Sequence, residues 1–474
     1  MTIDRRRLFA ALAGVTAAAG PAADAKPAPL HRLGENGEAE PAREVHLAAA
    51  REVAARAAID AAALGLRPNV SEDQSQAFQR AVDQAAAARA VLHLAPGFYR
   101  AGSLRLPPYA AIAGVSGATR IVMAAPPMMS AAGSDHVSIH GLVLDGVDIP
   151  LPARVGLVQF KQCRAVRIAD CEIVNAGGNG IAIEAVEGEV IGNTISAADA
   201  AIFSLDARGL RIAGNTVRGA GNGGILVWRT EPGEDGTLVT DNRIESIGAK
   251  AGGSGQYGNA INVFRADNVI VRGNRIRNAA FSAVRGNAAS NIQIVGNTCS
   301  GLGEVALYAE FGFEGAIIAN NIVDGAAIGV SVTNFNQGGR LAVVQGNLIR
   351  NLIGRRPLGT DPNDSAGIGI GVEADTVVTG NVVENAPNIG IAAGWGAYLR
   401  DVAITANIVR GADYGIAVSV APGAGTAVIA DNLMADIRRG ALVGMQLHDA
   451  VTGDLIKDGA ARYAQLSISG NRVR

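Results

Sequence analysis

The stretch from residue 258 to residue 311, GNAINVFRADNVIVRGNRIRNAAFSAVRGNAASNIQIVGNTCSGLGEVALYAEF, contains one unit that repeats. Each unit begins with a short alternating strand, at residues 260–264, 283–287 and 306–310. The strand after each of the first two ends in Gly-Asn, at Asn274 and at Asn297. Two residues after each of these Asn stands another apolar side chain, Ile276 or Cys299.

The same Asn recurs far beyond this stretch, at separations of 22 to 39 residues and always with an apolar residue two positions later. The full set is Asn193, Asn215, Asn242, Asn274, Asn297, Asn321, Asn347, Asn381, Asn407, Asn432 and Asn471. Weaker units fit at Cys171 and Leu142. A period of this length, built from short strands and turns, predicts a β-solenoid, because one coil cannot bury its apolar side alone. Leucine-rich repeats share the length but require a Leu pattern that is missing here.

We therefore expect an all-β chain of about 13 coils, stacked about 4.8 Å apart around one continuous core. The repeated Asn then forms a column at one turn, where Asn tolerates a left-handed backbone and stacked amides can bond along the column. We assign this column a structural role.

The first 25 residues resemble an export signal. Arg6-Arg7-x-Phe9 precedes a short run of Ala, Gly and Leu, and Ala23-Asp24-Ala25 provides a small-x-small cleavage site. The paired Arg predicts the twin-arginine export machinery as a partner, and a generic basic signal is the alternative. Either way we expect a periplasmic or secreted protein, cleaved near Ala25, whose mature chain has no membrane span.

Composition restricts the partners and cofactors. A net charge of −2 without a basic run argues against nucleic acid, and 61 of the 474 residues are Gly, which suits a chain rich in turns. The three Cys form no disulfide framework, and the six His are scattered. We expect no metal site and no cofactor; no Asp cluster supports calcium, and the oligomeric state stays open.

The chain divides into four parts on these signals. Residues 1–25 are the signal peptide, 26–57 a linker, 58–107 an N-terminal cap and 108–474 the repeats. Within the cap, Ser71-Glu72-Asp73-Gln74 is similar to a capping box, and apolar spacing predicts a helix to about Ala88. Such a helix would cover the open edge of the solenoid, and residues 454–462 would cover the other end less completely.

The segment LHLAPGFYRAGSLRLP after this helix resembles the start of pectin-lyase-like, right-handed, single-stranded parallel β-helix proteins. Together with the paired Arg, the motifs FSLDARG, NGGILVWR, SGQYGNAINVFRA, FSAVRGNAASNIQIVGN, EVALYAEFGFEGA and GVSVTNFNQGGRLAVVQGN resemble the twin-arginine-translocated uncharacterised repeat proteins. The resemblance implies fold and export but no reaction. Motifs of the polygalacturonase type are absent.

Strand alternation predicts which side chains point outward from the coils. The outward columns hold aromatic residues, then Asn, Arg, Tyr and Glu, in a chain with 4% aromatics. Exposed aromatic rings beside hydrogen-bonding groups suit sugar rings. The alternative is that loops cover this stripe and make it secondary core. The residues expected to bind substrate are Phe203, Trp228, Arg229, Tyr257, Asn262, Phe264, Arg265 and Asn287.

Two long insertions, residues 248–258 and 354–366, precede strands of this face, and residues 230–236 and 334–339 leave it at the far turn. Long loops on a rigid scaffold commonly carry function. We expect them to wall a groove with Arg285, Tyr308 and Glu310 near its floor.

Arg285, Tyr308 and Glu310 are the candidate catalytic residues. On a polyuronide, Arg285 would neutralise the carboxylate or assist proton abstraction, with Tyr308 or Glu310 as the acid/base partner. On a neutral glycan, Glu310 would need a second carboxylate about 5 to 9 Å away. The candidates for it are Asp206, Glu304, Glu314 and Glu373. A surface salt bridge between Arg285 and Glu310 without any reaction is the alternative.

Two functions follow from these residues. The first is an exported enzyme that acts on polysaccharide as a lyase, hydrolase or epimerase, with Arg229 and Arg265 favouring an acidic glycan. The second is a non-catalytic glycan-binding or envelope-associated solenoid.

Overall fold

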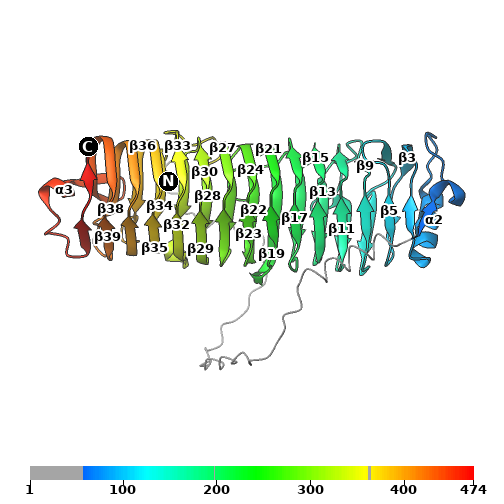
Figure 1. Cartoon of the computed structure of the whole chain (residues 1–474), viewed down its shortest axis with the longest axis horizontal. Coiled ribbons are helices and arrows are strands. Elements are labelled where there is room, and N and C mark those ends of the chain that lie inside the picture. The colour runs from blue at the N-terminus through cyan, green and yellow to red at the C-terminus, as the bar shows by residue number, and fades with distance from the viewer. Residues whose placement is uncertain (1–56, 197, 361–363) are drawn as a thin grey trace, which may run out of the picture. The chain divides into compact units, whose positions relative to one another are not determined.

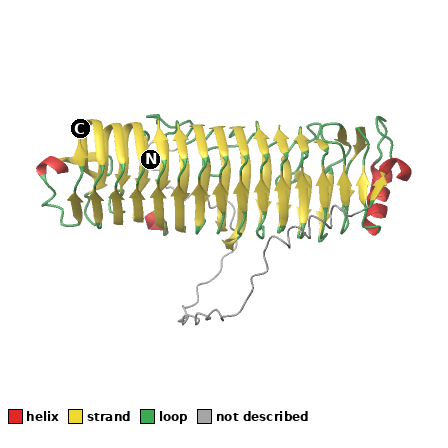
Figure 2. Ribbon diagram, viewed as in Figure 1, coloured by secondary structure: helices red, strands yellow, loops and turns green. Residues whose placement is uncertain are grey.

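The computed structural model describes residues 57–196, 198–360 and 364–474. They form one compact unit, a parallel β-helix of about 14 turns, one more than the sequence predicts. Strands make up nearly all of its regular structure (Figure 2). The expected signal peptide with Arg6 and Arg7, and nearly all of the expected linker, lie outside the described residues. Among the described helices, none has the length and apolar character to cross a membrane.

Most coils contribute one strand to each of three faces. The first face is a 16-stranded sheet whose strands pair in parallel. Its strands are β1 (Ala58–Asp60), β2 (Val91–His93), β5 (Ala111–Ala113), β8 (Ser138–His140), β11 (Val166–Ala169), β14 (Gly188–Ile191), β17 (Arg211–Ala213), β20 (Leu238–Thr240), β23 (Ile270–Arg272), β26 (Ile292–Val295), β29 (Glu314–Ala319), β32 (Arg340–Gln345), β35 (Ala374–Thr379), β37 (Arg400–Thr405), β39 (Ala427–Ala430) and β42 (Leu466–Ser469).

The second face follows the first in each coil, after the turn that carries the repeated Asn. Its strands are β3 (Gly97–Ala101), β6 (Thr119–Met123), β9 (Val143–Asp145), β12 (Glu172–Val174), β15 (Thr194–Ser196), β18 (Thr216–Arg218), β21 (Arg243–Ile247), β24 (Arg275–Ala279), β27 (Thr298–Leu302), β30 (Ile322–Asp324), β33 (Leu348–Arg350) and, at the end of the chain, β43 (Arg472–Val473).

The third face carries the sequence-predicted site. Its strands are β4 (Leu104–Arg105), β7 (Met129–Ala132), β10 (Gly156–Lys161), β13 (Asn179–Glu184), β16 (Ala200–Leu205), β19 (Gly223–Glu234), β22 (Asn259–Asp267), β25 (Val284–Asn287), β28 (Val305–Glu310), β31 (Ile328–Val332) and β34 (Ile368–Val372). Near the C-terminal end, three long strands run through both the second and the third face: β36 (Val382–Ala393), β38 (Ile408–Ser419) and β40 (Leu433–Gln446).

The eleven Asn lie in one column at the turn between the first and second faces, and all of them except the half-buried Asn471 are buried. In each step, the side-chain nitrogen donates to the amide oxygen of the next Asn, as from Asn274 to Asn297 at 3.0 Å, and to a backbone carbonyl, here Val239 at 2.9 Å. The next Asn's oxygen also accepts from the backbone N–H. Every hydrogen-bonding group of the amide is thereby satisfied inside the core, where an unpaired one is costly.

Both ends of the solenoid are covered. Helix α2 (Ser75–Ala87) packs Phe78 edge-to-face on Tyr99, with ring centroids 6.5 Å apart, next to the short helix η3 (Ala61–Leu64). The expected capping box does not form: the helix begins at Ser75, whose backbone N–H bonds to Asp73, and Gln74 makes no side-chain cap. At the other end, β41 (Asp449–Asp454) pairs antiparallel with β40 and leads into α3 (Leu455–Asp458) (Figure 1).

Candidate functional site

Three aromatic side chains from successive coils form a continuous cluster on the outside of the third face. We call Phe203, Trp228 and Phe264 the aromatic platform. The centroid of Trp228 lies 5.4 Å from that of Phe203 and 5.9 Å from that of Phe264, both in edge-to-face geometry. Phe203 is buried, while Trp228 and Phe264 are half-buried. The platform therefore offers solvent two rings that are held rigid by their neighbours.

The polar groups around the platform are only partly engaged. The indole nitrogen of Trp228 is buried and has no hydrogen-bond acceptor among the described residues. The Arg265 guanidinium lies 4.9 Å from the Phe264 ring centroid and donates to the Thr230 carbonyl at 2.8 Å. Arg229 donates to the Glu231 carbonyl of its own turn at 3.3 Å and to the Ala207 carbonyl of the preceding coil at 3.4 Å. The two guanidinium groups brace the start of residues 230–236, and neither forms an ion pair with a carboxylate among the described residues.

Further along the same face lies a buried ion network formed by Arg285, Glu304, Glu310 and Arg356. Arg285 binds Glu310 with two parallel hydrogen bonds, Nε to Oε1 at 2.6 Å and Nη2 to Oε2 at 3.0 Å. Its third nitrogen, Nη1, reaches Glu304 Oε2 at 3.2 Å. Arg356 closes the network with a 3.0 Å contact from Nη1 to the other oxygen of Glu304.

The network is shielded from solvent. The side chains of Arg285 and Glu310 are 8% and 2% exposed, and those of Glu304 and Arg356 are 4% and 9% exposed. Asn287 adds a 2.8 Å hydrogen bond from its amide nitrogen to Glu310. The expected groove floor is therefore not open to solvent at Arg285 and Glu310, and Asn287, which we expected to bind substrate, is buried as well.

Two long loops cause this burial. Residues 248–258 are tied down by Asn262, whose amide nitrogen donates to the Gly255 carbonyl at 2.8 Å. The other loop, which begins at residue 354, is tied by Arg356, which also donates to the Ser365 carbonyl. The two loops meet where the Ser254 N–H bonds to the Gly359 carbonyl. The loops cover the face instead of walling an open groove, and Asn262 is buried beneath the first of them.

Burial and charge set the protonation of these groups. Burial lowers the pKa of Arg285, but the neighbouring Glu310 and Glu304 raise it by more, so the guanidinium stays charged. Burial, then the charge of Glu310, raises the pKa of Tyr308, whose ring lies 4.9 Å from the Arg285 guanidinium. Burial also raises the pKa of Glu304, against the opposing effect of Arg285 and Arg356. Near neutral pH, Tyr308 can therefore donate a proton but cannot accept one.

Of the four candidates for a second carboxylate, Glu304 is the one that shares the Arg285 guanidinium with Glu310. The other three make contacts elsewhere. Asp206 accepts from Thr230, Glu314 pairs with Arg340, and Glu373 accepts from the N–H of Phe335, the first residue of the short helix η4 (Phe335–Gln337).

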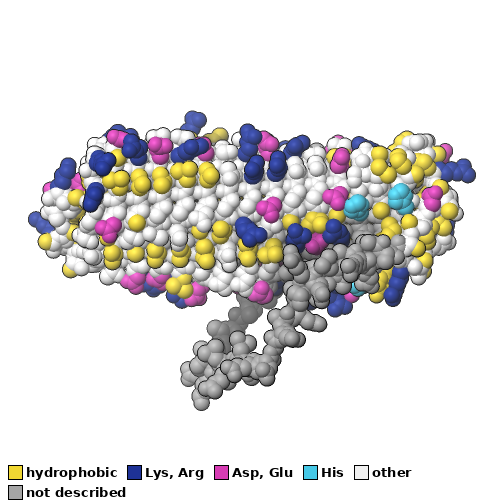
Figure 3. All heavy atoms as spheres, in the orientation of Figure 1, with side chains coloured by type: hydrophobic (Ala, Val, Ile, Leu, Met, Phe, Trp, Pro, Cys, Tyr) yellow, Lys and Arg dark blue, Asp and Glu magenta, His cyan; other side chains and the backbone are white. Residues whose placement is uncertain are grey.

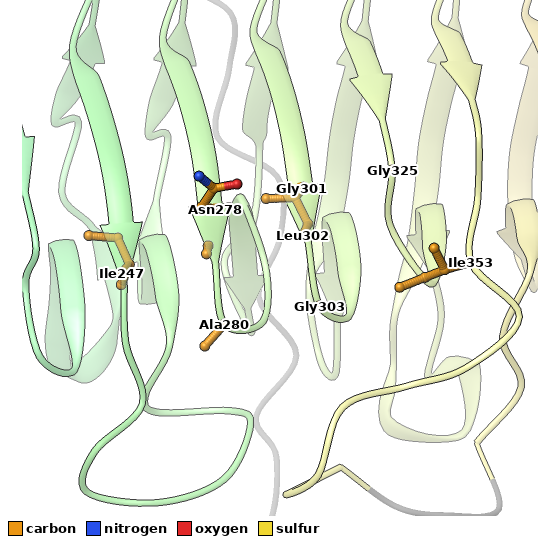
Figure 4. A pocket seen from close by; sticks show the side chains of 9 residues that line it. Ile247, Asn278, Ala280, Gly301, Leu302, Gly303, Gly325 and Ile353 are labelled. Carbon is orange, nitrogen blue, oxygen red and sulfur yellow. The ribbon is translucent and has the colours of Figure 1, made fainter.

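A pocket of about 460 Å³ opens at the corner between the second and third faces. Figure 4 shows Ile247 and Ile353 on its two sides, each where one of the long loops leaves the strands. Leu302 and Ala280 lie between them, and Asn278 brings the polar side chain of the lining. None of the sequence-predicted site residues lines this pocket; Tyr257 lies within the first loop and is half-buried.

The sequence analysis missed two features. The first is Arg356, which the sequence analysis includes only as part of a long loop. Its contact with Glu304 fixes this loop to the third face. Two adjacent Arg in a loop, close to a strand that contains Glu, are the sequence signal that could have indicated this contact. The second is a group near the C-terminal end, where the Trp395 ring packs edge-to-face on His448 at 4.5 Å and Tyr398 is 39% exposed. These three residues come from coils where the aromatic density of the sequence is low.

The residues described here do not assemble a metal site. Within residues 57–196, 198–360 and 364–474, no group of three or more His, Cys, Asp or Glu side chains converges as a metal ion requires. No step proposed below uses calcium or another metal ion.

Several solved structures are remotely similar to this chain. One of them is PfbA, a surface adhesin of Streptococcus pneumoniae. It is 14% identical with a TM-score of 0.48, and the match covers 84% of this chain and 95% of that one. The mannuronan C-5 epimerase AlgE6 A-module of Azotobacter vinelandii is 15% identical with a TM-score of 0.39, over 88% and 99%. An exopolygalacturonase of Thermotoga maritima is 13% identical with a TM-score of 0.36, over 84% and 94%.

No curated protein matches the chain. A family model does match, and it covers more than half of the residues. Residues 130–252 and 230–409 match the right handed beta helix region. The chain therefore belongs to the right-handed β-helix family.

Proposed function

We propose that this protein binds polysaccharide on its third face without cleaving it. The observation that carries the proposal is that the side chains of this face differ in their exposure to solvent. The candidate acid/base groups Arg285 and Glu310 are buried and satisfy one another, whereas Trp228 and Phe264 of the aromatic platform reach solvent. A surface of this kind can hold a ligand by stacking and hydrogen bonding, but it presents no free base to it.

The platform suits a sugar chain on chemical grounds. The C–H faces of pyranose rings pack against aromatic planes, and their hydroxyl groups need donors close by. The guanidinium groups of Arg229 and Arg265 are such donors. Trp228 and Phe264 occupy adjacent coils in paired register. Their ring centroids lie 5.9 Å apart, which is close to the length of one sugar residue, so neighbouring residues of one chain would reach both rings.

The buried ion network adds no attraction for an acidic glycan. The buried ion network and Asp364, which lies 3.4 Å from Arg356, together hold two cations and three carboxylates. The Arg285 guanidinium is thus already neutralised and would not attract the carboxylates of a polyuronide. The preference for an acidic substrate that the sequence suggests therefore rests on Arg229 and Arg265 beside the platform, which form no ion pair among the described residues.

Catalysis on polysaccharide is the second candidate, and one observation favours it. Glu304, with its raised pKa, and Glu310 contact the same guanidinium, so one could act as a general acid and the other as a base. Such an enzyme would need Arg356 to release Glu304, because its guanidinium closes the network. We rank this candidate second for that reason.

A glycan panel separates the two functions. We expect the purified protein to be retained on one or more polysaccharides of a panel of acidic and neutral glycans. Retention should be at least about tenfold weaker after Trp228→Ala or Phe264→Ala because each removes a stacking partner. The control is Tyr398→Ala, which removes an exposed aromatic ring outside the platform. Release of reducing ends or unsaturated uronate that disappears in Glu310→Gln would instead establish the enzyme. Equal binding by all variants would show that the aromatic platform does not bind the glycan.

We also propose that the protein is exported by the twin-arginine route and is a member of the twin-arginine-translocated repeat proteins. It is supported by Arg6-Arg7 and the cleavage motif ending at Ala25. Replacing both Arg with Lys should retain the protein, uncleaved, in the cytoplasm, as shown by fractionation of cells. Continued export of this variant would favour the ordinary route.

A further inference from the structure

A patch of exposed aliphatic side chains lies on the outer surface of the corner between the first and second faces, where the Asn column lies on the inside. Five successive coils, those of Asn321, Asn347, Asn381, Asn407 and Asn432, each place an apolar residue four positions before the Asn and another directly after it. We call these ten residues the apolar patch: Ile317, Val343, Val377, Ala403 and Val428 on the first face, and Ile322, Leu348, Val382, Ile408 and Leu433 on the second.

The patch is exposed to an unusual degree for aliphatic side chains. Ile317, Val377 and Val428 are 42%, 41% and 45% exposed, and Ile322, Val382 and Ile408 are 40%, 37% and 40% exposed. In Figure 3 they form two parallel yellow rows along one half of the solenoid. The five preceding coils have Thr194, Thr216, Arg243, Arg275 and Thr298 directly after the Asn, so the repeat itself does not require an apolar residue there.

The strip between the two rows is nearly uncharged. Its side chains are small or neutral in all five coils, apart from Asp431. An apolar centre without charge, bordered by polar residues, has the composition of a protein–protein interface. Aliphatic side chains also fit a sugar ring less well than the aromatic platform does.

The charged residues at the borders of the patch alternate in sign from coil to coil. The coil of Asn321 has Glu314 and Asp324, and that of Asn381 has Asp375 and Glu384. The coils of Asn347 and Asn407 have Arg340 with Arg350 and Arg400 with Arg410, while Asp436 borders the coil of Asn432. Neighbours pair along the solenoid, as Arg400 does with Asp375 at 2.5 Å and Arg350 with Asp324 at 2.9 Å. The coil of Asn407 also contains Asp401, but its two Arg leave the border of this coil positive.

This alternation decides which partner fits. A uniformly charged surface, such as an anionic membrane or a nucleic acid, meets as many like charges as opposite ones. A second copy can match the pattern, but only in one orientation. If the two solenoids ran parallel about a two-fold axis, each coil would face its own copy and like charges would meet. If they run antiparallel with the axis between the coils of Asn347 and Asn381, these two coils face each other and those of Asn321 and Asn407 do the same, so each of the four overlapping coils meets the opposite sign. The coil of Asn432 then lies outside the overlap.

We propose that the protein forms an antiparallel two-fold dimer through the apolar patch. The four overlapping coils, about 4.8 Å apart and with roughly ten residues of each at about 3.3 Å per residue, outline on the order of 600 Å² per copy. A standard stable interface buries about 800 Å² per partner, so the bordered patch is nearly large enough by itself. The aromatic platform lies on another face, and this inference does not depend on the proposed function.

Sedimentation of the purified chain tests the association. We expect a dimer in the micromolar range and, in a variant carrying both Val377→Arg and Val382→Arg, association at least about tenfold weaker, because two charges enter the apolar centre. Both side chains are exposed in the monomer, so the variant should keep its melting temperature. The control Thr194→Arg places the same charge at the equivalent ladder position outside the patch. A monomeric wild type, or a dimer that the double variant leaves intact, would overturn the proposal; a monomer would leave the patch to a different partner.

Small-angle X-ray scattering tests the orientation. The patch lies in the C-terminal half, so antiparallel copies overlap there and extend their N-terminal coils in opposite directions. From a rise of about 4.8 Å per coil, the longest dimension of the dimer should be about one and a half times that of the monomer. A dimer no longer than the monomer would mean parallel copies and would refute the proposed arrangement.

Discussion

At the scale of single residues, Arg285 holds two carboxylates that are buried with it. Arg285→Ala would leave Glu304 and Glu310 facing each other out of contact with water, where an uncompensated charge is costly. We expect the variant to lose about 3 to 5 kcal/mol of stability, measured by chemical denaturation.

A paired substitution separates charge from packing at this position. Replacing both partners, Arg285→Met with Glu310→Leu, removes the two charges together and leaves Glu304 with Arg356. Buried ion pairs can be exchanged for apolar side chains of similar volume at little cost, so the double variant should be closer to wild type than Arg285→Ala. Equal losses in both variants would show that shape, not charge, sets the contribution of Arg285.

Asp235 should make the fold sensitive to pH. Its side chain is buried, with one oxygen unpaired, and burial raises its pKa to about 6. The folded state therefore binds a proton more tightly than the unfolded chain, so stability decreases as pH rises from about 4 to 6 and the carboxyl ionises. Asp235→Asn should raise stability by on the order of 2 kcal/mol at pH 7.5 and change it little at pH 4.

Thermal melts at the two pH values test this prediction. Glu231→Gln removes a carboxylate from an exposed position in the same turn and is the control. An equal gain at both pH values would assign the effect to hydrogen bonding with Thr237, which contacts the other oxygen of Asp235, and would exclude its titration.

At the scale of structural elements, the Asn column should contribute most in the middle of the chain. Asn297→Ala removes the hydrogen bonds to Asn321 and to the Val271 carbonyl, and it leaves the N–H of Asn274 without its acceptor. We expect a loss of about 3 kcal/mol, because several buried groups lose their partners together. Asn471→Ala, at the end of the column and half-buried, should cost much less in the same denaturation experiment. Equal losses would mean that the column does not act as a continuous network.

The strands were predictable from the sequence, and the covering of the third face was not. The spacing of the Asn and the alternation around it place Arg285 opposite Tyr308 and Asn287 opposite Glu310, as the structure does. Exposure, in contrast, depends on residues 248–258 and 354–366, which have no period and whose path is set by single anchors such as Arg356. A repeat defines the residues that point outward, but only the loops decide which of these stay in contact with solvent.

At the scale of the whole molecule, each face carries a different surface. The aromatic platform lies on the third face, in the coils of Phe203 to Phe264, whereas the apolar patch lies on the first and second faces from Ile317 onward. Because a solenoid buries its core between neighbouring coils, its outward positions can vary along the axis without changing the fold. Glycan binding and dimerisation can therefore occupy one molecule together.

Because each coil contacts only its neighbours, a substitution in the N-terminal cap should destabilise the nearest coils and leave distant coils folded. Phe78 of α2 is fully buried against Tyr99 at the N-terminal end of the core. Phe78→Ala should cost about 3 to 5 kcal/mol locally. In hydrogen exchange we expect protection to fall in the first coils, from β1 to about β9, and to stay at the wild-type level beyond the middle of the chain, since each coil contacts only its neighbours. Ile391→Ala, in the core of β36, should instead lower protection on both sides of its own coil. A uniform fall along the whole chain after Phe78→Ala would mean that the solenoid unfolds as one cooperative unit.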